Sequence, residues 1–367
     1  MSNAKNIACP LLYRPTDDRF AESIRRFQGC PTLAVTRGGR IYLGWYSGGS
    51  REPHIENYNL LVYSDDRGAT WSRPILVIPS NRDLLVQALD IQLFTDPCGR
   101  LHVYWVQNNV SPFTGEMPPA KPGQPLVEVE GYVFGDFEHA MWETVCEDPD
   151  ADEPHFSEPR YLDMGFLRCK PLVLSSGRWL AFNYDQMSDR YGYSISDDRG
   201  RTFLRRYAGK KLATPFDEGM AYERRDGSVR LFLRSQLGEI TECDSYDGGE
   251  SFTDARLSGI DAPSTRFYVS RTPSGRILLV NNDDRAVRRN MTVYLSEDDG
   301  VSWAHTLCID GRENLSYPDV DFYGGRIYLT YDRERTGARE ILFTSFTEEE
   351  IIEGRMPTIR TVSKPTA

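Results

Sequence analysis

The sequence predicts an all-β fold, a six-bladed β-propeller of four-stranded antiparallel blades. The first observation is a repeated hairpin, in which a turn with glycine opens a short apolar strand, as in Gly39-Arg40-Ile41-Tyr42-Leu43. Its glycines recur roughly every 50 to 80 residues, at Gly39, Gly99, Gly177, Gly227, Gly275 and Gly325. Repeats of roughly 40–50 residues made of short strands are typical of propellers, so six hairpins predict six blades.

A second repeat follows four of these hairpins at a matching position. Its pattern is Ser-x-Asp-x-Gly-x-(Thr/Ser)-(Trp/Phe), and its copies span 64–71, 196–203, 245–252 and 296–303. Asp and Ser side chains hydrogen-bond the backbone of such a turn, glycine adopts a positive φ, and the aromatic ring fills the gap between sheets. We therefore interpret the four turns as elements that hold the fold together, and not as a binding site.

The first blade can be assigned strand by strand. We expect its strands at Pro31–Val35, Ile41–Tyr46, Tyr58–Tyr63 and Pro74–Ile78. The long polar loop at 47–56, between the second and third strands, is a candidate functional loop. Residues 1–26 are expected to complete the last blade, which would remove open sheet edges.

The other blades differ in their insertions. The second blade carries a proline-rich insertion at about 109–155, whereas the third, fourth and fifth are compact. The sixth, at 317–346, lacks the second repeat and is followed by a helix start at Thr347-Glu348-Glu349-Glu350. Because a propeller can use the whole chain, residues 1–367 are predicted to form one domain.

Composition limits the classes of function. The net charge of −11 argues against a nucleic-acid partner. The seven cysteines are odd in number and form no Cys-x-x-Cys pair, so neither a disulfide framework nor a zinc site is expected. The sequence starts without an apolar signal core and has no run of ~18 apolar residues, so we expect a cytoplasmic protein with no membrane contact. We also expect no metal and no cofactor. The sequence does not indicate an oligomeric state.

Polar side chains are expected to meet at one edge of the blades. The first strand of a blade starts at the edge where the second strand ends, and the turns of the second repeat lie at the opposite edge. Strand starts would supply Gln28, Asp90, Lys170, Glu218, Arg266 and Tyr317, and strand ends or the loops after them would supply Glu52, Glu56, Asn183, Arg234, Arg288 and Arg289. Such a hollow suits a polar ligand and favours shifted pKa values.

These features resemble the sialidases and their relatives over nearly the whole chain. The four turns of the second repeat look like the Asp boxes of that family. The segment from Glu218 to Arg234 is similar to the sialidase segment that carries a catalytic Glu and the second arginine of an arginine triad. The segment Arg289–Val293 looks like that of the third arginine, and 316–319 resembles the site of the nucleophilic tyrosine.

The resemblance implies a retaining glycoside hydrolase that removes a terminal, acidic sugar. Tyr317 would be the nucleophile and Glu218 would take its proton, because a phenol with a pKa near 10 is a poor nucleophile until a base activates it. Arg234 and Arg289, or the adjacent Arg288, would hold the substrate. The other expected substrate contacts are Gln28, Asp90, Lys170 and Arg51.

Two departures from the family pattern limit this implication. Gln28-Gly29-Cys30-Pro31 stands where sialidases have an Arg-Ile-Pro-type motif, so the first arginine of the triad is missing. Three arginines grip the carboxylate of sialic acid by bidentate bonds, so this loss weakens the case for sialic acid, with Arg25 or Arg51 as candidate replacements. Ile55 stands at the place of the acid/base Asp, and the neighbouring Glu56 is the expected proton donor.

Two alternatives remain open. The hydrolase could act on another acidic or neutral sugar, or the chain could be a sugar-binding propeller without catalysis. Each site residue also has a structural interpretation: Glu218 in an ion pair, Tyr317 as a packed strand aromatic, Glu56 as a solvated loop charge, and Asp90 and Lys170 in salt bridges. An enzyme needs Tyr317 and Glu56 aimed at one point, whereas a binding protein does not.

Overall fold

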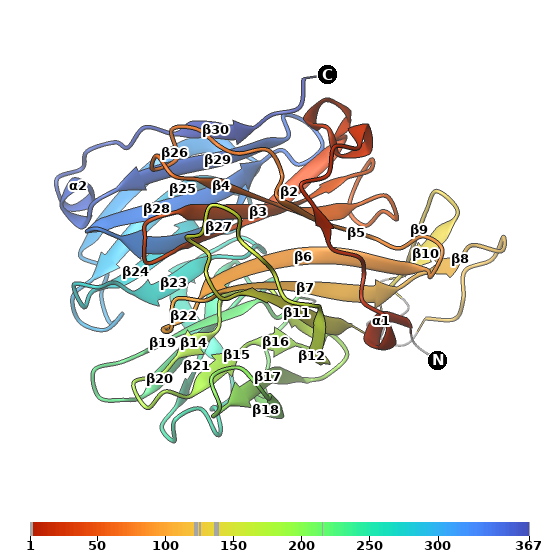
Figure 1. Cartoon of the computed structure of the whole chain (residues 1–367). Helices are drawn as coiled ribbons and strands as arrows, with labels where there is room; N and C mark the ends of the chain where they lie inside the picture. The colour runs from red at the N-terminus through yellow and green to blue at the C-terminus, as the bar shows by residue number, and fades with distance from the viewer. Residues whose placement is uncertain (1–2, 121–123, 125, 136–138, 215, 367) are drawn as a thin grey trace. The chain divides into compact units, whose positions relative to one another are not determined.

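The computed structural model of the chain describes residues 3–120, 124, 126–135, 139–214 and 216–366. These residues form strands and loops with only short helices, which confirms the predicted all-β fold (Figure 1). They divide into two compact units: Met1–Leu167, Glu334–Ile341 and Thr361–Ala367 form the first, and Arg168–Arg333 and Leu342–Arg360 the second. The single domain expected over the whole chain stays a prediction. No helix in the described part of the chain is long and apolar enough to cross a membrane.

The first unit consists of short N-terminal elements and three antiparallel sheets. Its elements are α1 (Asn3–Asn6), β1 (Leu12–Tyr13), 3-10 turns at Asp18–Phe20 and Glu22–Ile24, β2 (Phe27–Val35), β3 (Ile41–Gly48), β4 (Tyr58–Ser64), β5 (Leu76–Pro79), β6 (Val86–Thr95), β7 (Leu101–Asn109), β8 (Ser111–Pro112), β9 (Val127–Val129), β10 (Tyr132–Phe134), β11 (Ala140–Cys146), β12 (Arg160–Met164) and β13 (Phe166–Leu167). The sheet orders are β1-β5-β4-β3-β2, β8-β10-β9 and β12-β11-β7-β6. Strands β2 to β5 lie at the four strand positions predicted between residues 31 and 78, and β1 adds a fifth strand to their sheet.

Two expectations for the first unit need correction. The N-terminal segment does not supply a strand to the last blade, because β1 pairs with the free edge of β5, with Leu12 opposite Val77. The predicted insertion at 109–155 contains the small β8-β10-β9 sheet, but it also contains β11, which pairs with β7 along its length and belongs to the second large sheet. Residues 121–123, 125 and 136–138 of that range lie outside the described residues.

The second unit consists of four-stranded antiparallel sheets and a final strand pair. Its elements are β14 (Leu172–Val173), β15 (Trp179–Ala181), β16 (Asn183–Tyr184), β17 (Arg190–Ser196), β18 (Leu204–Lys210), β19 (Gly219–Glu223), β20 (Val229–Leu233), β21 (Glu239–Ser245), β22 (Arg256–Asp261), β23 (Tyr268–Arg271), β24 (Ile277–Asn282), β25 (Arg289–Ser296), β26 (His305–Glu313), β27 (Leu315–Tyr323), β28 (Arg326–Arg333) and α2 (Glu348–Ile352). The sheet orders are β14-β15-β17-β18, β19-β20-β21-β22 and β23-β24-β25-β26, and β27 pairs with β28. The chain also contains β29 (Glu340–Phe346) and β30 (Arg360–Ser363), whose ranges span a boundary between the units.

All six predicted hairpins are present. Each of the six glycines has a positive φ and lies between two paired antiparallel strands: β2–β3, β6–β7, β14–β15, β19–β20, β23–β24 and β27–β28. The expected helix start is also confirmed, because Thr347 and Glu350 form a capping box at the N-terminus of α2.

The four turns of the second repeat, called here the serine–aspartate turns, fold in the same way. Ser64 Oγ donates to Asp66 Oδ1 at 2.8 Å, and the Gly68 N–H donates to Ser64 Oγ at 2.9 Å. Thr70 donates to Asp66 through its Oγ1 at 2.6 Å and its N–H at 2.8 Å, and these bonds lower the pKa of Asp66 to about 2. The same four bonds recur in the other three turns.

Within a sheet, the serine–aspartate turn and the candidate site residues lie at opposite ends. In the β19–β22 sheet, Ser245 at the start of its turn is paired with Val229, the first residue of β20. At the other end of β20, the Arg234 N–H donates to the Glu218 carbonyl at 2.9 Å. The turn therefore supports the sheet from the side away from Glu218 and Arg234.

Strand β27 bends at Tyr317. Its pairing with β28 shifts between Ser316 and Asp319, and Tyr317 has a φ of 56°. A positive φ on a non-glycine residue costs on the order of 1–3 kcal/mol, and a bulge of this kind re-aims a side chain. Strands β2 and β6 show similar shifts at Cys30 and Asp90, which have φ values of 56° and 60°. The first strands of three hairpins, β2, β6 and β27, therefore share a bulge at a residue with a positive φ.

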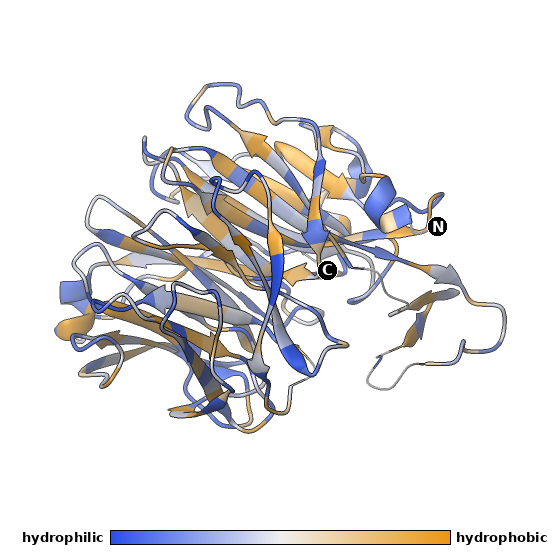
Figure 2. Ribbon diagram, turned by 90° about the horizontal axis from the view of Figure 1, so that it is seen from below, coloured by the Kyte–Doolittle hydropathy of each residue, from blue (hydrophilic) through white to orange (hydrophobic). Residues whose placement is uncertain are grey.

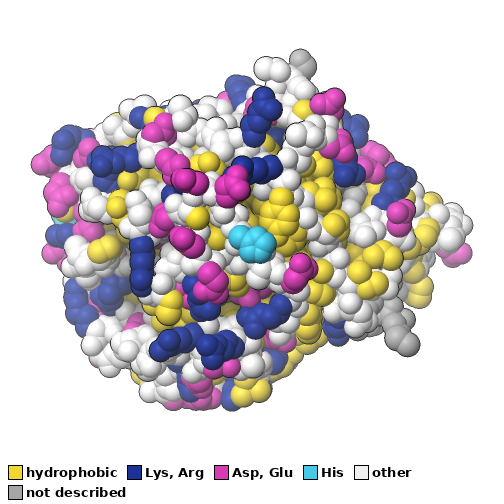
Figure 3. All heavy atoms as spheres, in the orientation of Figure 1, with side chains coloured by type: hydrophobic (Ala, Val, Ile, Leu, Met, Phe, Trp, Pro, Cys, Tyr) yellow, Lys and Arg dark blue, Asp and Glu magenta, His cyan; other side chains and the backbone are white. Residues whose placement is uncertain are grey.

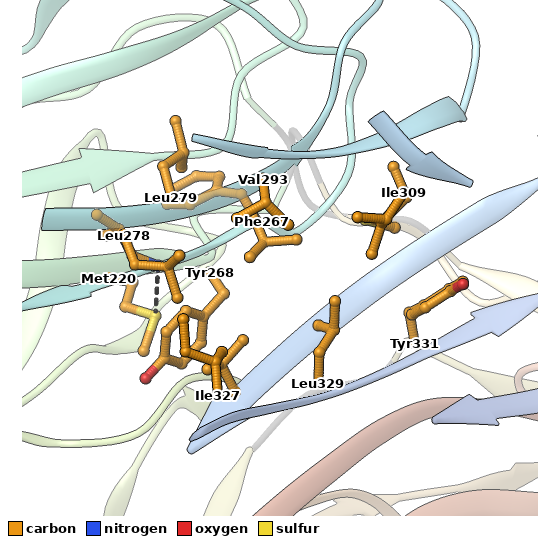
Figure 4. Packing of buried hydrophobic residues seen from close by; sticks show 14 of the residues in the cluster. Met220, Phe267, Tyr268, Leu278, Leu279, Val293, Ile309, Ile327, Leu329 and Tyr331 are labelled. Atoms are coloured by element: carbon orange, nitrogen blue, oxygen red, sulfur yellow. Dashed lines mark hydrogen bonds between the residues drawn. The ribbon is translucent and has the colours of Figure 1, made fainter. Parts of the chain in front are cut away.

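The core of the second unit is a cluster of aliphatic and aromatic side chains on β19, β23–β25, β27 and β28. Figure 4 shows Met220, Tyr268, Leu278 and Ile327 packed together, with the Val269 N–H donating to Met220 Sδ at 3.3 Å. In Figure 2 hydrophobic residues concentrate on the strands and the loops are mostly hydrophilic. Burial of this apolar surface fixes the strands whose ends carry Glu218, Arg234, Arg266 and Tyr317.

Charged side chains of both signs are interspersed over the face of the molecule seen in Figure 3. The negative net charge of the chain is therefore not gathered into one acidic area on this face. The positive cluster described next is buried and belongs to the second unit.

Candidate active site

Tyr317 and Glu218 form a buried pair in the second unit. The Tyr317 hydroxyl donates to Glu218 Oε1 at 2.5 Å. Glu218 immediately precedes β19, and Tyr317 lies at the bulge of β27, 99 residues further along the chain. Both side chains are almost fully buried, with exposed fractions of 2% and 4%. The sequence prediction that these two side chains share a site is consistent with this geometry.

Three arginines surround the pair. Arg234 Nη1 donates to Glu218 Oε2 at 2.9 Å and to the Tyr317 hydroxyl oxygen at 3.2 Å. Arg168 Nε lies 3.4 Å from Glu218 Oε1. The guanidinium carbons of Arg168 and Arg266 lie over the Tyr317 ring, 4.9 and 5.0 Å from its centroid. All three arginines are buried.

This surrounding charge controls the protonation of Glu218. Burial alone would raise the pKa of its carboxyl group, but Arg234 and Arg168, the Tyr317 hydrogen bond and Arg266 together lower that pKa to about 2. Burial also raises the pKa of Tyr184, on β16, well above its ordinary value, and the Glu218 charge adds to this effect. Glu218 is therefore a carboxylate at neutral pH, ready to accept the phenolic hydrogen bond.

Arg288 and Arg289 differ in what they contact. Arg288 is half-buried, and its Nη2 donates to the Ser264 carbonyl at 2.8 Å. Arg234 Nη2 donates to the same carbonyl at 2.8 Å, so Arg288 reaches the surroundings of Glu218. Arg289 is exposed and pairs with Asp284 at 2.7 Å. Of the two adjacent arginines in the prediction, the structure brings Arg288 and not Arg289 to this cluster.

Lys170 takes part in a separate contact in the second unit. Its Nζ donates to the Val320 carbonyl at 2.5 Å and lies 3.4 and 3.9 Å from carboxylate oxygens of Asp321 and Asp319. This arrangement corresponds to the salt-bridge interpretation of Lys170 and not to a ligand contact.

The predicted residues of the first unit lie in different surroundings. Gln28 is fully buried, donates to the Arg339 and Ser363 carbonyls, and accepts from Trp45 Nε1 at 3.1 Å. Arg51 is exposed in the loop between β3 and β4. Glu56 is exposed in the same loop and pairs with Arg82 at 3.1 Å.

Asp90 belongs to a small cluster in the first unit. One possible ligand atom from each of Cys30, Glu52 and Asp90 lies within 4.8 Å of the other two, the arrangement that could hold a metal ion. Arg335 Nη1 lies 3.2 Å from Glu52 Oε2, and its side chain runs so close to Gly29 that an added Cβ would meet Arg335 Cδ at 2.7 Å. A guanidinium group therefore already supplies a positive charge to Glu52.

Sequence reasoning missed Arg168, although a signal for it exists. Cys30, Asp90, Arg168, Glu218 and Arg266 each stand nine residues before the glycine of their hairpin, and Tyr317 stands eight before Gly325. The residues predicted at strand starts stand between seven and eleven residues before these glycines, and they include Gln28 and Lys170 in place of Cys30 and Arg168. A constant distance of nine residues from the glycine would have selected Cys30 and Arg168. Hairpins with strands of equal length place equivalent residues at the same end of their sheets.

The cluster can bind and polarise an uncharged or anionic polar group. It offers an ionised carboxylate, a phenol that can lose its proton to that carboxylate, and guanidinium groups that can stabilise negative charge. A phenol paired with a base, held in place by a third group, is the arrangement expected of an activated nucleophile.

Comparison with known proteins identifies the family to which this chain belongs. The family described as "BNR repeat-like domain" matches residues 136–328, which is more than half of the chain. The chain therefore belongs to the BNR repeat-like family, and this confirms the resemblance found in the sequence.

Sialidases and intramolecular trans-sialidases are among the proteins similar to this chain. The anhydrosialidase of Macrobdella decora is 26% identical over 188 residues, which cover 46% of this chain and 25% of that protein, so the match spans about a quarter of the relative's length. The NanB sialidase of Streptococcus pneumoniae has a TM-score of 0.68 at 16% identity, covering 92% of this chain and 71% of that chain. The intramolecular trans-sialidase of Ruminococcus gnavus, solved with oseltamivir carboxylate, has a TM-score of 0.67 at 16% identity, covering 96% and 99%. At these identities the two structures show a shared all-β fold, consistent with a β-propeller.

Proposed function

We propose that the chain is an exo-acting glycoside hydrolase that removes a terminal, acidic sugar with retention of configuration. The observation that carries this proposal is the buried hydrogen bond of 2.5 Å between Tyr317 and Glu218. Burying a phenol, a carboxylate and three guanidinium groups together is costly unless they are mutually paired. A tyrosine nucleophile is the known exception to the use of two carboxylates in retaining glycosidases, and the names of the relatives point to that chemistry.

The reaction would proceed in two displacements. First, Tyr317 Oη bonds to the anomeric carbon, its proton passes to Glu218, and the leaving oxygen departs with a proton from a carboxylic acid. Water then attacks the same carbon and gives a proton to the carboxylate that had protonated the leaving group, the bond to Tyr317 breaks, and the phenol recovers its proton from Glu218. Two successive inversions give a product of retained configuration.

The sequence resemblance implies that the proton donor is a carboxylic acid of the loop between β3 and β4. Glu56 is the residue expected from the sequence, but it is exposed and paired with Arg82. Glu52 is half-buried and lies beside Cys30 and Asp90, so it is the second candidate. Activity of Glu52→Gln and Glu56→Gln, measured with a substrate that has a good leaving group and one that has a poor one, separates them. Removal of the proton donor should slow hydrolysis of only the substrate that has the poor leaving group.

The sugar is bound mainly by groups other than Arg234. A guanidinium has five N–H donors, and four of those of Arg234 bond Ser264 Oγ, the Ser264 carbonyl, Glu218 and Tyr317. Arg288 is the better placed arginine for a substrate carboxylate. Because the first triad arginine is replaced and the second is engaged, we propose an acidic sugar other than sialic acid as the preferred substrate.

A sugar-binding protein without catalysis is the second candidate function. It is favoured by the same engagement of Arg234, because an arginine with four of its five N–H groups bonded within the protein can stabilise the fold without contributing to turnover. In both cases we propose six blades, supported by six hairpins and by the repeated serine–aspartate turns.

The test is a panel of 4-methylumbelliferyl glycosides, including glucuronides, galacturonides, sialosides and neutral sugars. We expect turnover of at least one by the wild-type chain and by Tyr323→Phe, a control on the same strand β27. Tyr317→Phe should be inactive on that substrate while keeping its affinity for the free sugar. Binding of a sugar without turnover of any glycoside would favour the second candidate.

A further inference from the structure

Two guanidinium groups lie over the ring of Tyr317. Arg168 Cζ and Arg266 Cζ are 4.9 and 5.0 Å from the ring centroid. Both arginines are buried, with exposed fractions of 6% and 3%. A cation over an aromatic face is attracted to the ring, and this attraction increases when water is excluded. It increases further if the ring becomes a phenolate, because the interaction is then between opposite charges.

Each arginine has its own polar contacts, hydrogen bonds for Arg266 and an ion pair for Arg168. Arg266 Nη1 donates to the Arg168 carbonyl at 2.6 Å, and its Nη2 donates to the Tyr317 and Pro318 carbonyls, both at 3.2 Å. Those two carbonyls belong to the bulge at which Tyr317 has its positive φ, so Arg266 holds the strained backbone in place. Arg168 contacts the other member of the pair, with its Nε 3.4 Å from Glu218 Oε1.

The same cations act on both members of the pair. Arg234, Arg168 and Arg266, with the Tyr317 hydrogen bond, lower the pKa of Glu218 to about 2, and a carboxylate with so low a pKa is a weak base toward a phenol. Transfer of the phenolic proton to Glu218 leaves the net charge of the cluster unchanged and moves the negative charge by the length of one hydrogen bond. The transfer becomes easier only if the phenolate meets as much positive charge as the carboxylate did.

We propose that Arg168 and Arg266 are positioning residues that stabilise the phenolate of Tyr317 and hold its ring in the attacking orientation. This proposal rests on the proposed role of Tyr317 as the nucleophile. Arg234, which touches the hydroxyl oxygen at 3.2 Å, acts at the oxygen, and the other two act over the ring. The bulge of β27 then aims the hydroxyl, and the arginines supply the charge.

The other titratable groups around Tyr317 do not supply this charge. Glu218 accepts the hydrogen bond of the Tyr317 hydroxyl. Tyr184 interacts electrostatically with both Glu218 and Tyr317. Asp319, two residues further along β27, lies 3.9 Å from Lys170. Cys169 is buried beside Arg168, and burial raises the pKa of its thiol to about 12. Among the residues that the structure describes, Arg168, Arg234 and Arg266 supply the positive charge in contact with Tyr317.

The experiment is an ultraviolet titration of tyrosinate formation, which needs no substrate. The difference between each protein and the same protein carrying Tyr317→Phe isolates the signal of Tyr317 from those of the other tyrosines. We expect Arg168→Gln and Arg266→Gln to move the midpoint of this signal upward by about one pH unit or more, a tenfold change in the ionisation constant. Arg168→Lys keeps the charge but not the planar group, and should move it by less.

The control is Arg271→Gln. Arg271 lies on β23, close in sequence to Arg266, but it bonds Asp299 at 2.7 Å and the Glu223 carbonyl, away from Tyr317. It should leave the midpoint unchanged. Near-ultraviolet circular dichroism identifies the variants that fold, and Arg168→Lys carries the test if a glutamine variant does not.

An unchanged midpoint in folded Arg168 and Arg266 variants would overturn the proposal. Failure of the proposed function gives a different result: the midpoints still shift, but Tyr317→Phe retains turnover. The two failures are therefore distinguishable, and a shift that accompanies loss of turnover supports both proposals.

Discussion

Glu218 Oε2 and Arg234 Nη1 are 2.9 Å apart, and both side chains are buried. Burial alone would lower the pKa of Arg234, but the Glu218 carboxylate, together with Tyr317 and Tyr184, raises that pKa above its ordinary value. Each charge of the pair is therefore stabilised by the other. Glu218 stands immediately before β19, and Arg234 immediately after the adjacent strand β20. Removing one of them leaves the other buried without its main partner.

Glu218→Gln should destabilise the second unit. The amide keeps the shape but leaves Arg234 and Arg168 without their carboxylate, so we expect a loss of about 3 kcal/mol in the free energy of unfolding. Urea denaturation measures it. The control is Glu297→Gln, whose carboxylate pairs with Arg276 at 3.2 Å in a largely exposed position and should change stability by less than about 1 kcal/mol. Equal effects of the two substitutions would contradict this account of the pair.

Common synthetic sialosides should be poor substrates. Gln28 is buried and hydrogen-bonded in the first unit, and Arg234 has four of its five N–H groups engaged, so a substrate carboxylate loses two of the expected contacts. We expect kcat/KM for a sialoside to be about 10²-fold lower than for the best acidic glycoside. Steady-state kinetics on the two substrates measure the ratio. A sialoside that matched or exceeded every other glycoside would show that the missing arginine is replaced.

Asp217 should make stability depend on pH near neutrality. Its carboxyl group is buried beside Lys211 at 2.8 Å, and burial raises its pKa to about 7 despite that cation. Because the folded pKa is above the unfolded value near 3.9, its contribution to stability is present below about pH 4 and is lost as pH rises to about 7.

Asp217→Asn removes this titration. The melting temperature of the wild-type chain minus that of the variant should therefore increase as pH falls from 8 to 5, measured by scanning calorimetry. Asp284→Asn is the control, since the pKa of Asp284 is already about 2 and does not titrate in that range. Parallel curves for wild type and Asp217→Asn would mean that Asp217 keeps one protonation state throughout.

The serine–aspartate turns should stabilise the fold at neutral pH and lose that effect in acid. Asp66→Asn removes an acceptor for Ser64 and Thr70 and should cost about 1 kcal/mol at pH 7. Since the folded pKa is about 2 and the unfolded value is near 3.9, the difference from wild type should shrink as pH falls from about 4 to 2. Thermal melts at several pH values measure it, with the exposed Asp83→Asn as control. A difference that stays constant down to pH 2 would contradict the assignment.

The parts of the fold that repeat in sequence were predictable. Hairpin glycines and serine–aspartate turns act through their own backbone, so their geometry follows from a few neighbouring residues. The segment at Leu12 and Tyr13 had no such signal, because its place depends on the free edge of β5, which lies more than sixty residues away.

The candidate site was predictable where family motifs and strand position agree, as for Glu218, Arg234 and Tyr317. Arg168 was missed because the position of Lys170, two residues further on, also suited a strand start. The choice between Arg288 and Arg289 depends on the pairing shift between Arg289 and Met291, which no local pattern reveals. Such bulges exchange the side chains that face each side of a sheet.

The most direct test of the central claim is covalent trapping of the nucleophile. The wild-type chain is incubated with a fluorinated glycosyl fluoride of the sugar that proves active, digested, and analysed by tandem mass spectrometry. We predict one glycosyl adduct, on Tyr317, which is absent in Tyr317→Phe and present in Tyr323→Phe. An adduct on a carboxylate, or hydrolysis of the glycoside with inverted configuration and no adduct, would contradict the claim that Tyr317 is the nucleophile.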